Sequence, residues 1–174
     1  LDSLFSVWND KDQSSLERLG AMNVIAFSGY LYKDPDSAYY YAQKQLDLAS
    51  ATNSELHVSK ALITQAESHR LRAKYSDAVK LLQRALMIKR EIGDVRGEGA
   101  ATYCLGLCYV SLGRSQDAVE SYEQARLAYE QVKDSSGIAK SLIGLGNAHS
   151  TLSQLSIAQD YYERSLLIAV ARAD

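Results

Sequence analysis

The sequence predicts an all-α protein built from four helical hairpins, and three observations lead to this prediction. The 174 residues include one proline, Pro35, in a chain rich in helix-forming Ala, Leu, Gln and Glu. Small residues recur every forty residues. Dipeptides that can end one helix and cap the next recur with the same period. We therefore expect about eight antiparallel helices and no strand.

The forty-residue period defines the repeats. The two recurring series of small residues are Ala26, Ala66, Gly106 and Gly146, and, twelve residues after each of these, Ala38, Ala78, Ala118 and Ala158. A period of about 20–50 residues is typical of arrays in which each repeat is one supersecondary unit. We predict a single array over 1–174, with repeats at approximately 14–53, 54–93, 94–133 and 134–174.

Turn and capping residues place the helices in order along each repeat. In the first repeat, Asp36 shares its phase with Ser76 and Ser156, so we expect it to cap a helix rather than to bind Mg²⁺. Asn53-Ser54, Gly93-Asp94 and Lys133-Asp134 separate successive repeats, and Gly113-Arg114-Ser115 divides the third. The expected helices lie near 14–32, 36–51, 54–73, 76–92, 95–112, 116–132, 135–152 and 155–172.

The small residues also predict where the two helices of a hairpin come closest. Helices approach most closely where their side chains are smallest, and larger neighbours fill the surrounding space. In the third repeat the small residues are Gly106 and Ala118, and the larger ones are Leu105, Tyr109 and Tyr122. We therefore expect the crossing at Gly106.

Charge and hydropathy exclude several classes of partner. Nineteen Lys and Arg against twenty-one Asp and Glu give a net charge of −2, so no overall basic field favours nucleic acid or anionic lipid. The longest apolar run, 166–171, is far shorter than a membrane span, so we expect no direct membrane insertion. The default expectation is a soluble, cytoplasmic protein. Because the sequence begins at Leu1, we expect a processed product or an excised segment.

No catalytic, cofactor or metal site is predicted. His69 and His149 lie eighty residues apart, at the place that Tyr109 takes in the third repeat, so we expect them to be packing residues. Cys104 and Cys108 lack further ligands nearby in sequence, so we expect free thiols. The Gly144-Leu145-Gly146 segment lacks the third glycine and the preceding strand of a dinucleotide loop. We therefore expect a protein that is not an enzyme.

Two repeats carry a family signature. Leu105-Gly106-Leu107-Cys108-Tyr109 with Ala118, Tyr122 and Ala125, and Leu145-Gly146-Asn147-Ala148-His149 with Ala158, Tyr162 and Ser165, resemble the tetratricopeptide repeat (TPR). The forty-residue period is similar to the long-helix subclass of kinesin light chains, spindle-orientation adaptors and bacterial regulators. The second repeat departs at Gln65, where Leu is usual, and the first at Ile25, Gly29 and Gln45. The resemblance implies a right-handed superhelical solenoid of four TPR hairpins.

The resemblance also implies a function and a set of groove residues. In TPR proteins the first helix of each hairpin lines a concave face, so we expect a non-enzymatic scaffold that binds a peptide or partner helix there. The groove candidates are Asn23, Phe27, Tyr30, Lys60, Ile63, Glu67, Arg70, Tyr103, Leu107, Val110, Lys140, Ile143, Asn147 and Ser150. The family's two-carboxylate clamp is not reproduced, because Tyr103 and Leu107 stand where polar residues are needed.

A weaker resemblance leaves a second interpretation open. The segments 1–10, 29–31 and 34–42 are similar to the start of the repeat region in bacterial sensor proteins. This similarity implies a sensory or regulatory input module whose output, a nucleotide cyclase or a histidine kinase, lies outside the chain. A membrane-anchored sensor of that kind would place the module in the periplasm.

The last expected helix carries apolar residues that nothing in the sequence covers. They are Leu155, Tyr162, Leu166, Ile168 and Val170. A repeat array needs a polar outer face on its final helix. We therefore expect either that the parent protein continues with further repeats or that the chain self-associates through this helix.

Overall fold

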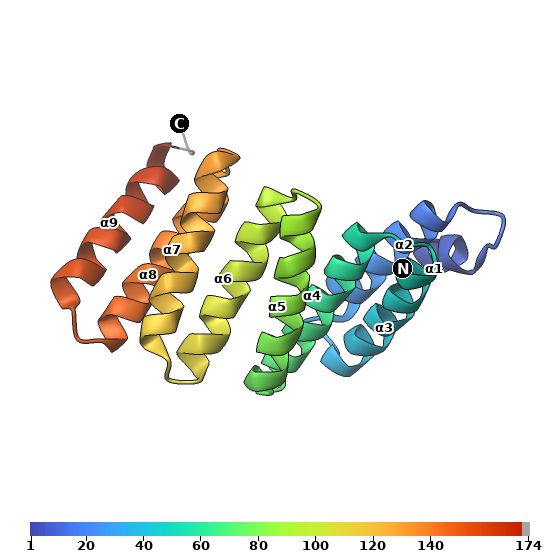
Figure 1. Cartoon of the computed structure of the whole chain (residues 1–174), viewed down its shortest axis with the longest axis horizontal. Coiled ribbons are helices and arrows are strands. Elements are labelled where there is room, and N and C mark those ends of the chain that lie inside the picture. Colours follow the sequence, from blue (N-terminus) through green and yellow to red (C-terminus); the bar gives the residue numbers. More distant parts are fainter. Residues whose placement is uncertain (172–174) are drawn as a thin grey trace. The chain divides into compact units, whose positions relative to one another are not determined.

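The computed structural model describes residues 1–171, and within them the fold is all-α, as predicted. The elements follow in chain order (Figure 1): α1 Asp2–Asn9, α2 Ser15–Val24, the π-helix η1 Ile25–Tyr30, α3 Pro35–Ala51, α4 Glu55–Leu71, α5 Tyr75–Glu91, α6 Val95–Ser111, α7 Ser115–Gln131, α8 Ser135–Thr151 and α9 Leu155–Ala171. The described residues thus form nine α-helices, one more than the eight expected. Residue 172, the expected end of the last helix, lies outside the described residues.

The helix that the sequence analysis missed is α1. Its residues Leu4, Phe5, Val7 and Trp8 are half-buried at helical spacing. The helix packs against α2, and Arg18 on α2 donates from Nε to the carbonyl oxygen of Trp8 over 3.0 Å. Eight residues give too short a periodic pattern to stand out from the sequence.

The chain divides into two compact units, Leu1–Ile92 and Gly93–Asp174. The first unit holds α1 to α5, in which η1 continues α2 directly, α3 packs against η1 and α4, and α4 pairs with α5. The second unit holds α6 to α9, in which α6 pairs with α7 and α8 with α9, and α7 also packs against α8. Each unit therefore consists of TPR-like hairpins in which helices that follow one another along the chain pack together. The single continuous array over 1–174 stays a prediction.

The turns between helices follow the predicted capping chemistry with two corrections. Gly93 and Lys133 adopt left-handed backbone angles, with φ of 69° and 54°, and Asp94 and Asp134 then cap α6 and α8 through their side chains. The cap of α3 is Asp34, not Asp36, because the Asp34 side chain accepts from the backbone N–H of Ser37.

The second correction concerns Ser54, which precedes α4. Its side chain makes no capping hydrogen bond; its hydroxyl lies 2.9 Å from Nδ1 of His57. This local contact replaces the expected cap.

Tyrosine rings fill the closest helix approaches of the second unit. A Cβ added at Gly106 would lie 2.5 Å from Cε1 of Tyr122, and one at Gly144 would lie 2.7 Å from Cδ1 of the same ring. The predicted crossing at Gly106 is therefore confirmed. Tyr129 lies in the same way between α6 and α8, where a Cβ at Gly137 would come within 2.3 Å of its ring.

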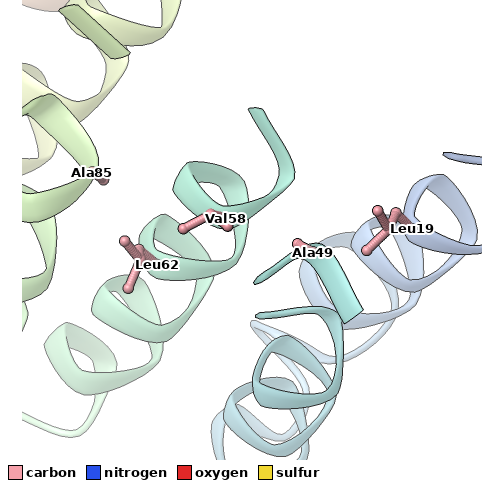
Figure 2. Packing of buried hydrophobic residues seen from close by; sticks show 5 residues of the cluster. All are labelled: Leu19, Ala49, Val58, Leu62 and Ala85. Atoms are coloured by element: carbon pink, nitrogen blue, oxygen red, sulfur yellow. The ribbon is translucent and has the colours of Figure 1, made fainter. Parts of the chain in front are cut away.

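Aliphatic side chains build the core of the first unit. Leu19 on α2, Ala49 on α3, Val58 and Leu62 on α4, and Ala85 on α5 form one buried cluster (Figure 2). Small residues on α3 and α5 let the helices approach, and branched residues on α2 and α4 fill the space between them. This cluster lies behind the candidate site.

Candidate functional site

A cavity of about 200 Å³ opens between α2–η1 and α4 in the first unit. Asn23 on α2, Phe27 on η1, and Lys60, Ile63 and Thr64 on α4 line it. We call it the α2–α4 pocket. It is formed by the first helices of the first two hairpins, which are the elements that the family resemblance assigned to the groove.

Sequence reasoning named four of the five lining residues and missed Thr64. Asn23, Phe27, Lys60 and Ile63 were all predicted to face the groove. Thr64 lies next to Ile63 and one helical turn after Lys60, so the same helical spacing could have found it. It is 1% exposed, so it offers little surface to the pocket.

The apolar wall of the pocket comes from Phe27 and Ile63. Phe27 is 38% exposed, whereas Ile63 is half-buried against the core cluster of the first unit. Phe27 lies within η1, and π-helical turns inside α-helices are frequent at functional sites. The pocket is smaller than the roughly 300–1,000 Å³ of drug-sized ligand sites. Because about 150 Å³ accommodates benzene, the pocket suits one large apolar side chain.

Hydrogen-bond donors dominate the polar wall. Asn23 accepts a hydrogen bond on Oδ1 from Nε2 of Gln45 over 3.5 Å, which leaves its own N–H groups available. The Thr64 hydroxyl donates to the carbonyl oxygen of Lys60 over 3.2 Å. Within the described residues, the Lys60 ammonium has no hydrogen bond or ion pair. A bound acceptor group is therefore the complement of this wall.

Two lysine charges, those of Lys60 and Lys89, lie near His57 in the first part of α4. Burial lowers the pKa of His57, and the nearby charges of Lys60 and Lys89 lower it further. His57 is 4% exposed, so its ring is held neutral inside the unit at neutral pH. An anionic group of a ligand would meet a favourable field at Lys60.

Three other predicted groove residues of the first unit lie outside the pocket lining. Glu67 and Arg70 pair with each other, with Nη2 of Arg70 2.8 Å from Oε2 of Glu67. Tyr30 belongs to an aromatic cluster with α3 and α1, since its ring centroid lies 5.0 Å from that of Tyr41, which contacts Phe5 at 5.3 Å.

The predicted groove residues of the second unit fall into two groups. Tyr103, Leu107 and Val110 are half-buried and pack against the core cluster around Tyr122. The exposed group is Lys140, Ile143, Asn147 and Ser150 on α8. We expect the first group to contribute to stability as well as to any contact surface.

The histidines at equivalent repeat positions pack against tyrosines. The ring of His69 lies 5.0 Å from that of Tyr39, and His149 stacks on Tyr161 at 5.4 Å. Within the described residues, neither Cys104 nor Cys108 forms a disulfide, as predicted. Within residues 1–171, no three His, Cys, Asp or Glu side chains converge as metal ligands, and no helix has the length and hydropathy needed to cross a membrane.

The last described helix, α9, exposes several apolar side chains. Leu155, Leu166, Leu167 and Val170 are each more than half exposed. Ile168 is half-buried against the core cluster of the second unit, so it is only partly uncovered. Self-association through this helix stays a prediction.

Comparisons with known proteins bear on the family. A model of the tetratricopeptide repeat matches residues 98–169. No curated protein matches the chain. The comparisons identify a repeat region and no catalytic domain.

Solved structures with the same fold cover nearly the whole chain. BtubC (BKLC) from P. vanneervenii is 17% identical, with a TM-score of 0.80 over 99% of this chain and 71% of its own. Aspartyl phosphate phosphatase F from Bacillus subtilis is 16% identical, with a TM-score of 0.85 over 93% of this chain and 43% of its own. A Podospora anserina kinesin light chain-like protein with nearly identical TPR-like repeats is 19% identical, with a TM-score of 0.72 over 99% of this chain and 85% of its own.

The chain spans less than two thirds of aspartyl phosphate phosphatase F and of RapI, to which it is similar with a TM-score of 0.83 over 99% of this chain and 62% of RapI. At these identities the likeness concerns the fold. Residues 98–169 match the tetratricopeptide repeat family, and the fold of the whole chain resembles the kinesin light chain-like and Rap regulator TPR structures.

Proposed function

We propose that this protein is a non-enzymatic interaction scaffold that binds a peptide or helical segment of a partner protein in the α2–α4 pocket. The observation that carries the proposal is the pocket itself, whose walls are the first helices of two successive hairpins. TPR domains generally act in protein–protein interaction, and recognition of an extended or helical segment needs a groove with apolar anchors and polar orienting groups.

In this proposal one apolar side chain of the partner fills the pocket between Phe27 and Ile63. Asn23 and the Lys60 ammonium then bind acceptor groups of the partner's backbone or of an acidic side chain beside the anchor. Interfaces of this kind depend on a few central anchors, each of which contributes about 2 kcal/mol or more. The Glu67–Arg70 pair and the α8 residues Lys140, Ile143, Asn147 and Ser150 are candidates for contacts with the rest of the partner.

A related fold has been solved with a ligand. A Rap protein complexed with competence and sporulation factor has a TM-score of 0.77 to this chain at 17% identity. This precedent supports a binding role for the fold and leaves the identity of the partner to experiment.

Panning tests the proposal. A phage-displayed library of random dodecapeptides is selected on the whole chain, on the Phe27→Ala/Ile63→Ala variant, and on Leu127→Ala as a control. Leu127 is 48% exposed on α7 and far in sequence from the pocket. We expect peptides that the chain and the control retain, and that the pocket variant binds about 30-fold more weakly. Equal enrichment on all three proteins, with circular dichroism confirming folded helices, would contradict the proposal.

A sensory input role is the second candidate. The TPR sensor-containing signal transduction ATPase from Pyrococcus horikoshii has a TM-score of 0.76 over 92% of this chain and 26% of its own. If this chain is an input module, the full-length gene encodes an output domain beyond it. Sequencing the complete reading frame decides between a scaffold and a module of a larger signalling protein.

A further inference from the structure

A buried polar side chain lies directly behind the α2–α4 pocket. Gln45 on α3 has no exposed surface. The residues at the same repeat position in the other three hairpins are small: Ala85, Ala125 and Ser165. A long amide therefore occupies a place that the rest of the protein fills with a methyl or hydroxymethyl group.

Gln45 satisfies only part of its hydrogen-bonding capacity. Its Nε2 donates to the carbonyl oxygen of Leu19 over 3.4 Å and to Oδ1 of Asn23 over 3.5 Å. Its Oε1 is buried and has no hydrogen-bond partner among the described residues. An unpaired buried acceptor destabilises a fold, because the group has lost its hydration without replacement. Packing alone therefore gives no reason for a glutamine here.

The contact with Asn23 supplies a reason. Because Asn23 Oδ1 faces Gln45, the amide nitrogen on the other branch of the planar carboxamide points away from Gln45 and is available to the pocket that Asn23 lines. Without Gln45, rotation of the carboxamide would present an acceptor there as readily as a donor.

We infer that Gln45 is a positioning residue of the α2–α4 pocket, which fixes the Asn23 carboxamide so that its N–H groups donate to an acceptor of the bound peptide. The inference rests on the proposed function and adds the residue that sets the polarity of the pocket wall. The oriented Asn23 N–H groups then favour ligands that have a carbonyl or carboxylate oxygen beside the apolar anchor.

The Gln45→Leu variant tests the inference, because leucine is similar in size and removes the unpaired acceptor. We expect the thermal midpoint to rise by a few degrees, since a buried polar group without a full set of partners is removed. We also expect a peptide selected on the unmodified chain to bind about two- to tenfold more weakly, which corresponds to one net hydrogen bond. A residue that only packs would move stability and binding in the same direction.

Gln65→Leu is the matched control. Gln65 on α4 is 2% exposed and donates from Nε2 to Oε1 of Gln43 over 2.8 Å, and it does not line the pocket. This variant also replaces a buried glutamine by leucine, but we expect unchanged peptide affinity. A cycle with Asn23→Ala completes the design: if Gln45 acts through Asn23, Gln45→Leu has no further effect on affinity in the Asn23→Ala background.

The side-chain amide signal of Asn23 in ¹⁵N-resolved NMR spectra decides the inference without a ligand. We expect the two Asn23 amide protons to show shifts away from random-coil values and the relaxation of a rigid group in the unmodified chain and in Gln65→Leu, and sharper signals near random-coil shifts in Gln45→Leu. Unchanged Asn23 signals in Gln45→Leu, or unchanged peptide affinity, would overturn the inference. Failure to select any peptide on the unmodified chain would instead contradict the proposed function, while the NMR comparison still decides the role of Gln45.

Discussion

The two units share one repeat period but fill their helix crossings differently. In the second unit, Tyr122 packs onto Gly106 and Gly144, and Tyr129 onto Gly99 and Gly137. In the first unit the positions of Gly106 and Tyr122 are taken by Ala66 and Leu82, both fully buried. A ring against a glycine fixes one close approach, whereas an alanine and a leucine allow a less specific one.

Buried polar side chains of uncommon size for these positions are found in the first unit and not at the equivalent positions of the second. The first unit buries Gln45, Gln65 and Lys89 and contains the π-helix η1 and the α2–α4 pocket. The second unit packs its equivalent positions with small and apolar residues such as Ala125, Leu105 and Tyr129. These departures from the regular repeat therefore fall in the unit that holds the candidate binding site.

Overpacking a glycine crossing gives the largest expected effect. Gly106→Leu forces a large side chain into the space of the Tyr122 ring, so we expect a loss of about 3 kcal/mol in the free energy of unfolding. Urea denaturation followed by circular dichroism measures the loss, and hydrogen exchange should locate it in α6 to α8. A variant that melts like the unmodified chain would show that the crossing tolerates a side chain.

Replacing Gly106 and Tyr122 by the alanine and leucine found at the equivalent positions of the first unit tests whether the two residues are energetically coupled. Tyr122→Leu alone leaves a void against Gly106 and Gly144 and should cost about 2 kcal/mol. Gly106→Ala alone should destabilise through its clash with the ring. The double variant reproduces the Ala66 and Leu82 arrangement of the first unit, and we expect it to be more stable than the sum of the single effects predicts. Strict additivity in the double-mutant cycle would argue against direct coupling.

Acid should weaken the first unit through its histidines. Burial lowers the pKa of His57 and of His69 in the folded chain, and Lys60 and Arg72 respectively lower them further. The unfolded chain then binds more protons than the folded one below about pH 6.5, the ordinary value for histidine. The stabilisation is complete above that pH and is lost as the pH falls through the folded pKa values.

We expect the thermal midpoint to fall between pH 8 and pH 5, and to fall less in the His57→Gln/His69→Gln variant. The carboxyl groups whose pKa is lowered in the fold, such as Asp34 and Asp134, titrate below this window. An identical pH dependence in the variant would assign the effect to other groups.

A glycine without a packing partner gives the smallest effect. Gly20 lies inside α2, and a Cβ added there would meet nothing within 4 Å. Gly20→Ala should therefore stabilise the chain by about 0.5–1 kcal/mol through helix propensity. A loss of stability comparable to that of Gly106→Leu would show that Gly20, like Gly106, lies at a packed position. Thermal melts of both variants make the test.

Much of the architecture was determined by the sequence alone. The forty-residue recurrence from Ala26 to Gly146 placed eight helices to within a few residues, because each helix must turn the same small and apolar face towards its neighbours. The closest crossing at Gly106 followed from the same rule. The family resemblance, combined with helical spacing, also predicted Phe27, Lys60 and Ile63 as groove residues, and all three line the α2–α4 pocket.

The tertiary structure alone decided what lies between elements distant in sequence. In the sequence, Gln45 is only a departure from the small residues at the equivalent repeat positions. The packing of α3 against α2 brings its amide group to Asn23. Tyr30 and Tyr103 were predicted as groove residues by their phase, but aromatic partners on other helices, Tyr41 and Tyr122, draw their rings into local clusters. Periodicity specifies the face of a helix on which a residue lies. Burial and hydrogen bonding there depend on the neighbouring helix, which a local pattern does not encode.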